Sequence, residues 1–224
     1  GDGARARHAI EGSSQGSHMT AATQPASHGS LAQAYRTVRA HSVALARPLS
    51  PEDCQIQSMP DASPVKWHLA HTSWFFETVI LARRAGYRPF DTSFAYLFNS
   101  YYEALGPRQP RPRRGLITRP TLEAVLAYRA HVDAAMQEAL SDRALHDAIV
   151  LGLHHEQQHQ ELILTDIKHA FFANPLLPAY RAQASAPAKP APLQWQRHPG
   201  GIVQIGHDGT GFAFDNETPR HQVL

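Results

Sequence analysis

Two histidines four residues apart, in the segment LHHEQQHQELILTDIKH, form the pattern in this chain with the clearest chemical meaning. On an α-helix, side chains four positions apart project from one face, one turn above the other. His155 and His159 are therefore predicted to offer two imidazoles to one metal ion. His154 would point about 100° away from His155 on a regular helix, which excludes it from the pair.

The third ligand is expected from another helix, and the segment WHLAHTSWFFE offers His68 and His71. Trp67, Ala70 and Trp74 define the side of this predicted helix that should be buried. His71 falls near that side, whereas His68 lies about 60° away from it, so His71 is the predicted ligand. Three neutral imidazoles with open coordination positions are typical of a catalytic metal site rather than a structural one.

Neighbouring polar residues have predicted supporting roles. Gln158 should border the same pocket and could hydrogen-bond a bound ligand. Glu161 lies about 200° round the helix from His159, which makes it a poor metal ligand. A role in supporting a ligand through a hydrogen bond, or in packing the bundle, suits Glu161 better.

A long proline-rich connection over residues 87–118 carries several arginines. Five arginines cluster in its second half and just after it: Arg108, Arg111, Arg113, Arg114 and Arg119. They could be a solvated loop, or they could reach the mouth of a bundle and bind a substrate carboxylate. Arg111 and Arg114 are candidate substrate-binding residues, together with Tyr102, for which packing in the core or at the rim is the other interpretation.

The string from His155 to His159 also matches H-E-x-x-H, the zinc-peptidase motif in which the glutamate is the general base. Glu156 would have that role. A peptidase of this type needs a catalytic sheet before the helix and a third ligand after it. Here helices are predicted before the motif and a proline-rich segment after it, so the peptidase is the weaker alternative.

The apolar period predicts four helices, over about residues 30–47, 64–85, 120–140 and 143–172. Their lengths, with a long crossover between the second and the third, make an antiparallel four-helix bundle the simplest architecture.

Composition divides the chain into four parts. Residues 1–30 are polar and Gly/Ser-rich and are interpreted as a disordered tag and N-terminal segment, followed by the helical bundle over 31–174. Residues 175–195 are Pro/Ala-rich and predict a linker. Residues 196–224 have β-branched runs between Gly and Asn/Asp turns, which indicates the beginning of a second unit.

Overall composition excludes several classes of protein. The chain has 224 residues, 42% of them hydrophobic, and a net charge of only +2, so it predicts no nucleic-acid partner. No apolar run is long enough for a membrane span, and Cys54 is the one cysteine, which excludes a disulfide framework. A cytoplasmic location is the default expectation, and nothing in the pattern indicates an oligomeric state.

Four segments, taken in order, resemble the iron(II)-dependent sulfoxide synthases of ergothioneine biosynthesis, the EgtB type. They are WHLAHTSWFFE, YLFNSYYEALG, RGLITRPTLEAV and HHEQQHQELILTDIKH. The segment GGIVQIGHDGTGFAFDNETPRHQV is similar to the opening of the second domain of these enzymes, which has the formylglycine-generating-enzyme fold. The resemblance implies a mainly α protein, with a DinB-like four-helix bundle followed by the beginning of an α+β, C-type-lectin-like domain.

The same resemblance implies an oxidoreductase whose Fe(II) is held by His71, His155 and His159. Members use O₂ to join the sulfur of cysteine or γ-glutamylcysteine to C2 of the hercynine imidazole. It also implies that Gln158 lies near the bound imidazole and that loop arginines receive the carboxylates of the thiol. The catalytic tyrosine of the family would lie beyond Leu224. Either thiol donor stays open, as does histidine in place of hercynine.

A third function stays open beside these two. DinB-like bundles also include metal-dependent thiol transferases, which bind a metal without a second domain. The aromatic-rich segment around His71 and the segment that follows the linker favour the sulfoxide synthase over a transferase.

Overall fold

The computed structural model describes residues 28–100, 106–182 and 190–224. Its α-helices are α1 (His28–Ala46), α2 (Val65–Val79), α3 (Phe94–Leu97), α4 (Leu122–Ala139) and α5 (His146–Ala173). Its strands are β1 (Val203–Ile205) and β2 (His221–Val223). Short 3₁₀ turns lie at Asp53–Gln55, Leu81–Arg83, Arg111–Leu116, Arg143–Leu145 and Asp215–Glu217. Of residues 1–30, which we interpreted as a disordered tag and N-terminal segment, residues 1–27 lie outside the described residues.

The four long helices begin and end close to the predicted positions, except for the end of α2. This helix stops at Val79 and continues as a 3₁₀ turn over Leu81–Arg83. At the start of α4 the side chain of Thr121 accepts a hydrogen bond from the backbone N–H of Ala124, which caps the helix.

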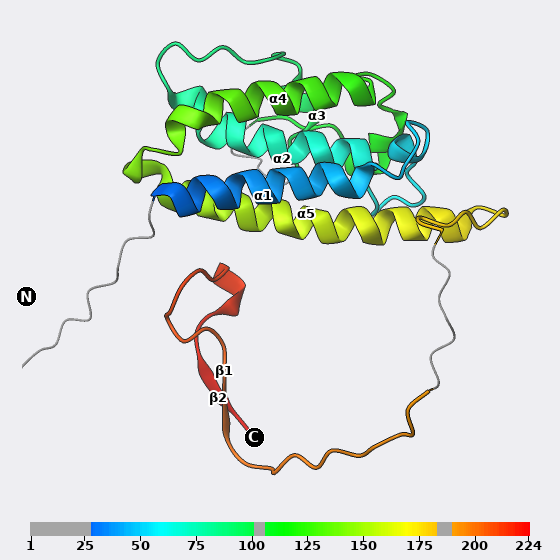
Figure 1. Cartoon of the computed structure of the whole chain (residues 1–224), viewed down its shortest axis with the longest axis vertical. Helices are drawn as coiled ribbons and strands as arrows, with labels where there is room; N and C mark the ends of the chain where they lie inside the picture. Colours follow the sequence, from blue (N-terminus) through cyan, green and yellow to red (C-terminus); the bar gives the residue numbers. More distant parts are fainter. Residues whose placement is uncertain (1–27, 101–105, 183–189) are drawn as a thin grey trace, which may run out of the picture.

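The directions of two helices differ from those expected in the antiparallel bundle that we predicted. The colours of Figure 1 show α1 and α5 running one way and α2 and α4 running the other. Neighbouring α2 and α4 are therefore parallel, and Arg84 after α2 contacts Glu138 near the end of α4 at 3.3 Å. The connection between them is long enough to return the chain to the end of the bundle where α2 began.

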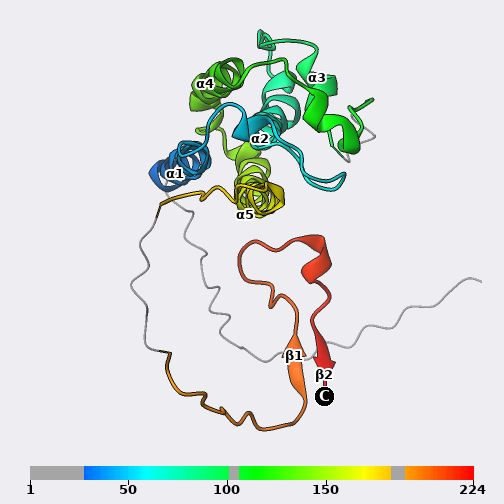
Figure 2. The same ribbon diagram turned by 90° about the vertical axis from the view of Figure 1, so that its right-hand side faces the viewer.

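Helix α2 lies between α4 and α5, as the end-on view in Figure 2 shows. This position explains why every residue from Val65 to Glu77 is buried. Gly152 on α5 faces Phe75 and Phe76 of α2, and a Cβ atom at Gly152 would lie 2.5 Å from Phe76 Cε1. The absence of a side chain there lets the two helices approach closely, just where their histidines meet.

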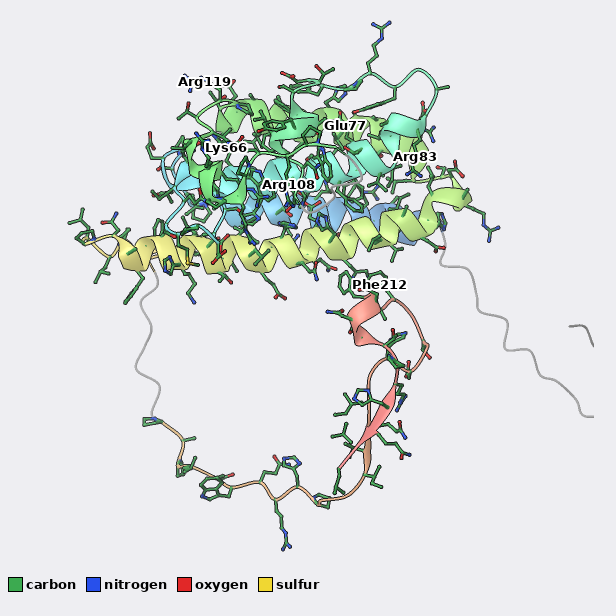
Figure 3. The ribbon with its side chains drawn as sticks, turned by 180° about the vertical axis from the view of Figure 1, so that it is seen from behind. Lys66, Glu77, Arg83, Arg108, Arg119 and Phe212 are labelled. Carbon is green, nitrogen blue, oxygen red and sulfur yellow. The ribbon has the colours of Figure 1, made fainter. Side chains whose placement is uncertain are left out.

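After the bundle, β1 and β2 form a two-stranded antiparallel ladder with Gln204 opposite Gln222. Both strands are exposed along their length. Phe212, in the turn between them, stacks on His154 of α5 with ring centroids 4.0 Å apart (Figure 3). Within the described residues, no helix combines the length and the apolar character needed to cross a bilayer.

Candidate metal centre

Three histidines from two helices converge inside the bundle. His71 comes from α2, and His155 and His159 come from α5. One ring nitrogen from each lies within 4.8 Å of the others. The ring centroids of His71 are 4.9 Å from His155 and 4.7 Å from His159. These are the three residues that helical spacing selected, and their nitrogens are close enough to share one metal ion.

His71 is fixed on both sides of its ring. It stacks between Trp67 and Trp74, each at an interplanar angle of 16°. Its Nδ1 lies 2.6 Å from the backbone oxygen of Phe98. A carbonyl oxygen only accepts, so Nδ1 carries the hydrogen of the neutral ring and Nε2 keeps its lone pair. The two tryptophans of α2 and the Phe98 carbonyl after α3 thus hold the His71 ring in one orientation, with Nε2 as the nitrogen that could bind a metal.

Burial keeps the three imidazoles neutral. Desolvation holds the pKa of His71 and of His159 well below the usual value, and neighbouring histidines add to the effect. Desolvation lowers the pKa of His155 to about 4, although the adjacent Glu156 opposes the shift. Since a metal binds the neutral ring, protons compete little for these sites at pH 7.

One buried nitrogen shows that the cluster fits a metal. Nδ1 of His155 is buried and has no hydrogen-bond partner among the described residues. An unpaired buried nitrogen is costly in an ordinary core, whereas a metal ligand needs such an atom. The donor set of three neutral imidazoles suits Fe(II), Zn(II) and similar ions.

A cavity of about 410 Å³ opens onto the three histidines. Gln158, Arg111 and Arg114, the candidate substrate-binding residues, are among the residues that line it. The guanidinium of Arg114 lies 3.4 Å from the centre of the Trp67 ring and donates hydrogen bonds to the hydroxyls of Ser63 and Ser100. Arg114 is therefore buried and held in place at the cavity wall.

The other arginines of the connection have different positions. Arg108 donates to the backbone oxygen of Ser100 at 2.6 Å, which places it beside this cavity rather than in its wall. Arg113 and Arg119 are exposed, and neither lines the cavity. Tyr102 lies outside the described residues, so the structure says nothing about its predicted role.

The role predicted for Glu161 is wrong. Its side chain is exposed and does not line the cavity. The cause is the helical angle noted above, which turns Glu161 away from the face that carries His155 and His159. A different carboxylate, that of Asp166, lies behind the histidines.

Glu156 points away from the cavity, into a buried network of charges. Its carboxylate accepts hydrogen bonds from Arg39 at 3.0 Å, Arg129 at 2.8 Å and Ser42 at 2.6 Å. Burial alone would raise the pKa of Glu156, but the two arginines outweigh it and lower the pKa to about 2. A fully buried carboxylate with these partners cannot act as a general base on a water at the histidines, which removes the basis for the zinc-peptidase alternative.

The profile of the DinB superfamily matches residues 34–163, more than half of the chain. The chain belongs to the DinB superfamily. Comparison with curated proteins finds no match. The DinB domain runs from within α1 to within α5 and contains all three histidines, so the family and the cluster both point to a metal-dependent protein.

Two further residues stand close to the centre: His68, which was not predicted to be a ligand, and Asp166, for which no role was predicted. His68 lies beside His159 rather than in the cluster, and Asp166 lies behind His68. Asp166 is seven residues after His159, which is nearly two full turns, so it shares the face of the metal ligands. That spacing is the signal that could have identified it.

Proposed function

We propose that the DinB domain holds Fe(II) through His71, His155 and His159, and that the protein is an EgtB-type sulfoxide synthase of ergothioneine biosynthesis. The observation that carries the proposal is the set of three neutral, convergent imidazoles at the base of a cavity walled by Arg111 and Arg114. When bound, iron supplies the one-electron chemistry that O₂ needs to react with a thiol.

The residues of the cavity have distinct roles in this proposal. Arg111 and Arg114 bind the carboxylate groups of cysteine or γ-glutamylcysteine, since a guanidinium matches a carboxylate with two parallel hydrogen bonds. Arg114 is already fixed by Ser63 and Ser100, so it loses little freedom on binding. Gln158 lies at the exposed side of the cavity and hydrogen-bonds the imidazole of hercynine.

Residues 196–224 are part of the second, C-type-lectin-like domain in this proposal. Three features support that assignment: the sequence resemblance, the short β1–β2 ladder, and exposed apolar residues such as Val203 and Ile205. Apolar side chains on a strand are typical of a sheet that packs against further structure.

The experiment that tests the proposal begins with anaerobic loading of the protein with Fe(II). Metal stoichiometry is measured first. O₂ uptake is then measured with hercynine and either cysteine or γ-glutamylcysteine as the thiol donor. The thiol–hercynine sulfoxide is detected by mass spectrometry. One iron per chain, lost in His71→Ala, is the expected result for the metal centre. Sulfoxide formed when the iron-loaded protein is combined with the second domain of the family is the expected result for the synthase.

Two outcomes would point elsewhere. Transfer of a thiol to an acceptor without consumption of O₂ would assign the protein to the thiol transferases. A chain that binds no metal at any of the three histidines would remove the proposed centre altogether.

A further inference from the structure

A fourth histidine lies buried against the proposed centre and makes hydrogen bonds with both ring nitrogens. His68 is 1% exposed. Its Nε2 lies 2.9 Å from Oδ2 of Asp166, and its Nδ1 lies 2.8 Å from Nδ1 of His159. The order in space is Asp166, His68 and His159, leading from helix α5 to helix α2 and back to α5.

The chemistry of the three side chains fixes the direction of each hydrogen bond. A carboxylate only accepts, so His68 donates from Nε2 to Asp166. In a neutral ring the other nitrogen then has a lone pair, so Nδ1 of His68 accepts. His159 must donate from its own Nδ1, which leaves the lone pair of His159 on Nε2.

Asp166 itself is anchored by the backbone. The same Oδ2 atom accepts a hydrogen bond from the N–H of Ser63 at 2.8 Å, and the residue is 9% exposed. Ser63 in turn accepts from Arg114 through its hydroxyl. The carboxylate therefore has a fixed position relative to the cavity wall before any ligand binds.

We propose that Asp166 and His68 form a positioning relay that fixes the tautomer and orientation of His159, so that its Nε2 atom faces the metal. This inference rests on the proposed metal centre. Neither residue touches the metal, and both act through His159. Hydrogen-bond partners behind a metal ligand usually change metal affinity by about 10–100-fold when they are removed.

The relay is tested with Co(II) as a spectroscopic probe, by titration of the metal-free protein in competition with a chelator. His68→Leu removes both hydrogen bonds and should weaken Co(II) binding by about 10–100-fold. His68→Asn keeps an acceptor near the position of Nδ1 and should lose less than about tenfold. Asp166→Asn removes the charge and should weaken binding while changing the visible spectrum of bound Co(II).

A double variant separates a relay from two unrelated effects. Once His68 is leucine, Asp166 has no path to His159. Adding Asp166→Asn should then change Co(II) affinity by less than about twofold, because residues acting through one path are not additive. A full additional loss in the double variant would overturn the relay.

Glu77→Gln is the matched control, since Glu77 is also a buried carboxylate and accepts hydrogen bonds from Tyr87, Tyr128 and the backbone N–H of Phe90. This variant should affect folding without changing Co(II) affinity. If Glu77→Gln weakened Co(II) binding as much as Asp166→Asn does, the loss would reflect general destabilisation and the relay would be wrong.

Nitrogen NMR of the metal-free wild-type protein needs no variant and decides the proton positions directly. The relay requires hydrogen on Nε2 of His68 and on Nδ1 of His159, and the opposite tautomer at either residue would overturn it. Wild-type affinity in a folded His68→Leu would overturn the relay alone. A wild-type protein that binds no Co(II) would overturn the metal centre and the relay together.

Discussion

At the scale of single residues, the centre depends on which ring nitrogen of each histidine already makes a hydrogen bond within the protein. Nδ1 of His71 makes a hydrogen bond with the Phe98 carbonyl oxygen, and Nδ1 of His159 makes one with His68. Nδ1 of His155 has no hydrogen-bond partner among the described residues. The ring of Phe75 packs beside the His155 ring, with the two ring centroids 4.7 Å apart. Two of the three proposed ligands are thus oriented by hydrogen bonds and one by packing.

Replacing His155 should abolish tight metal binding, whereas replacing its neighbour should not. His155→Ala removes one of three ligands, so Co(II) affinity should fall more than the roughly 100-fold that marks the loss of an indirect partner. His154→Ala is the matched control, because His154 is adjacent in sequence but stacks on Phe212 outside the cluster. Equal losses in the two variants, measured by Co(II) titration, would contradict the assignment of ligands.

At the scale of elements, helix α5 carries two unrelated faces. One face presents His155 and His159 to α2, and another presents Glu156 to Arg39 of α1 and Arg129 of α4. Arg39 also contacts Asp133 of α4 at 2.6 Å. These buried charged side chains connect α1, α4 and α5. The position of the histidines on α5 therefore depends on ion pairs that do not contact them.

Glu156→Gln should therefore destabilise the fold, and the loss should depend on pH. Removing one partner from a buried ion network costs about 3–5 kcal/mol. The folded-state pKa of about 2 lies below the ordinary value of 4.5, so the carboxylate stabilises the fold fully above pH 4.5 and loses this effect as the pH falls toward 2.

Urea unfolding of the metal-free protein at pH 7 and at pH 3 measures this dependence. The difference between wild type and Glu156→Gln should shrink at the lower pH. Glu161→Gln, on the exposed side of the same helix, is the control and should change stability by no more than about 0.5 kcal/mol. A difference for Glu156→Gln that is the same at both pH values would show that its charge is not the cause.

The close approach of α2 and α5 gives a second prediction for these elements. Gly152→Ala places a Cβ atom against Phe75 and Phe76, and overpacking of this kind costs about 1–3 kcal/mol. The better helix propensity of alanine recovers at most about 1 kcal/mol. We expect a net loss of stability in urea, together with weaker Co(II) binding because the helices that carry the ligands move apart.

The exposed variant Gln157→Ala tests the same helix without the contact. It should be neutral or slightly stabilising, since alanine favours the helix. If Gly152→Ala were also stabilising, a Cβ atom at position 152 would fit between α2 and α5 without strain, and the prediction of overpacking would be wrong.

At the scale of the whole molecule, sequence patterns predicted the four long helices, and they predicted that His71, His155 and His159 lie on facing sides of two of them. They did so because apolar period and helical spacing depend on local geometry alone. The directions of the helices, the burial of Arg39 and the place of Asp166 depend on contacts between elements far apart in sequence. Charged residues such as Arg39 are usually exposed, so a single sequence gives no sign that they are buried.

A metal bound between α2 and α5 should also stabilise the whole bundle. An ion that binds only the folded chain adds about 2.7 kcal/mol when its free concentration is 100 times the dissociation constant. Co(II) should therefore raise the melting temperature of the wild-type protein in a concentration-dependent way. His155→Ala should melt at the same temperature with and without the metal, because one of the three proposed ligands is missing. Equal stabilisation of both proteins would place the ion elsewhere on the molecule, because binding at the three histidines needs His155.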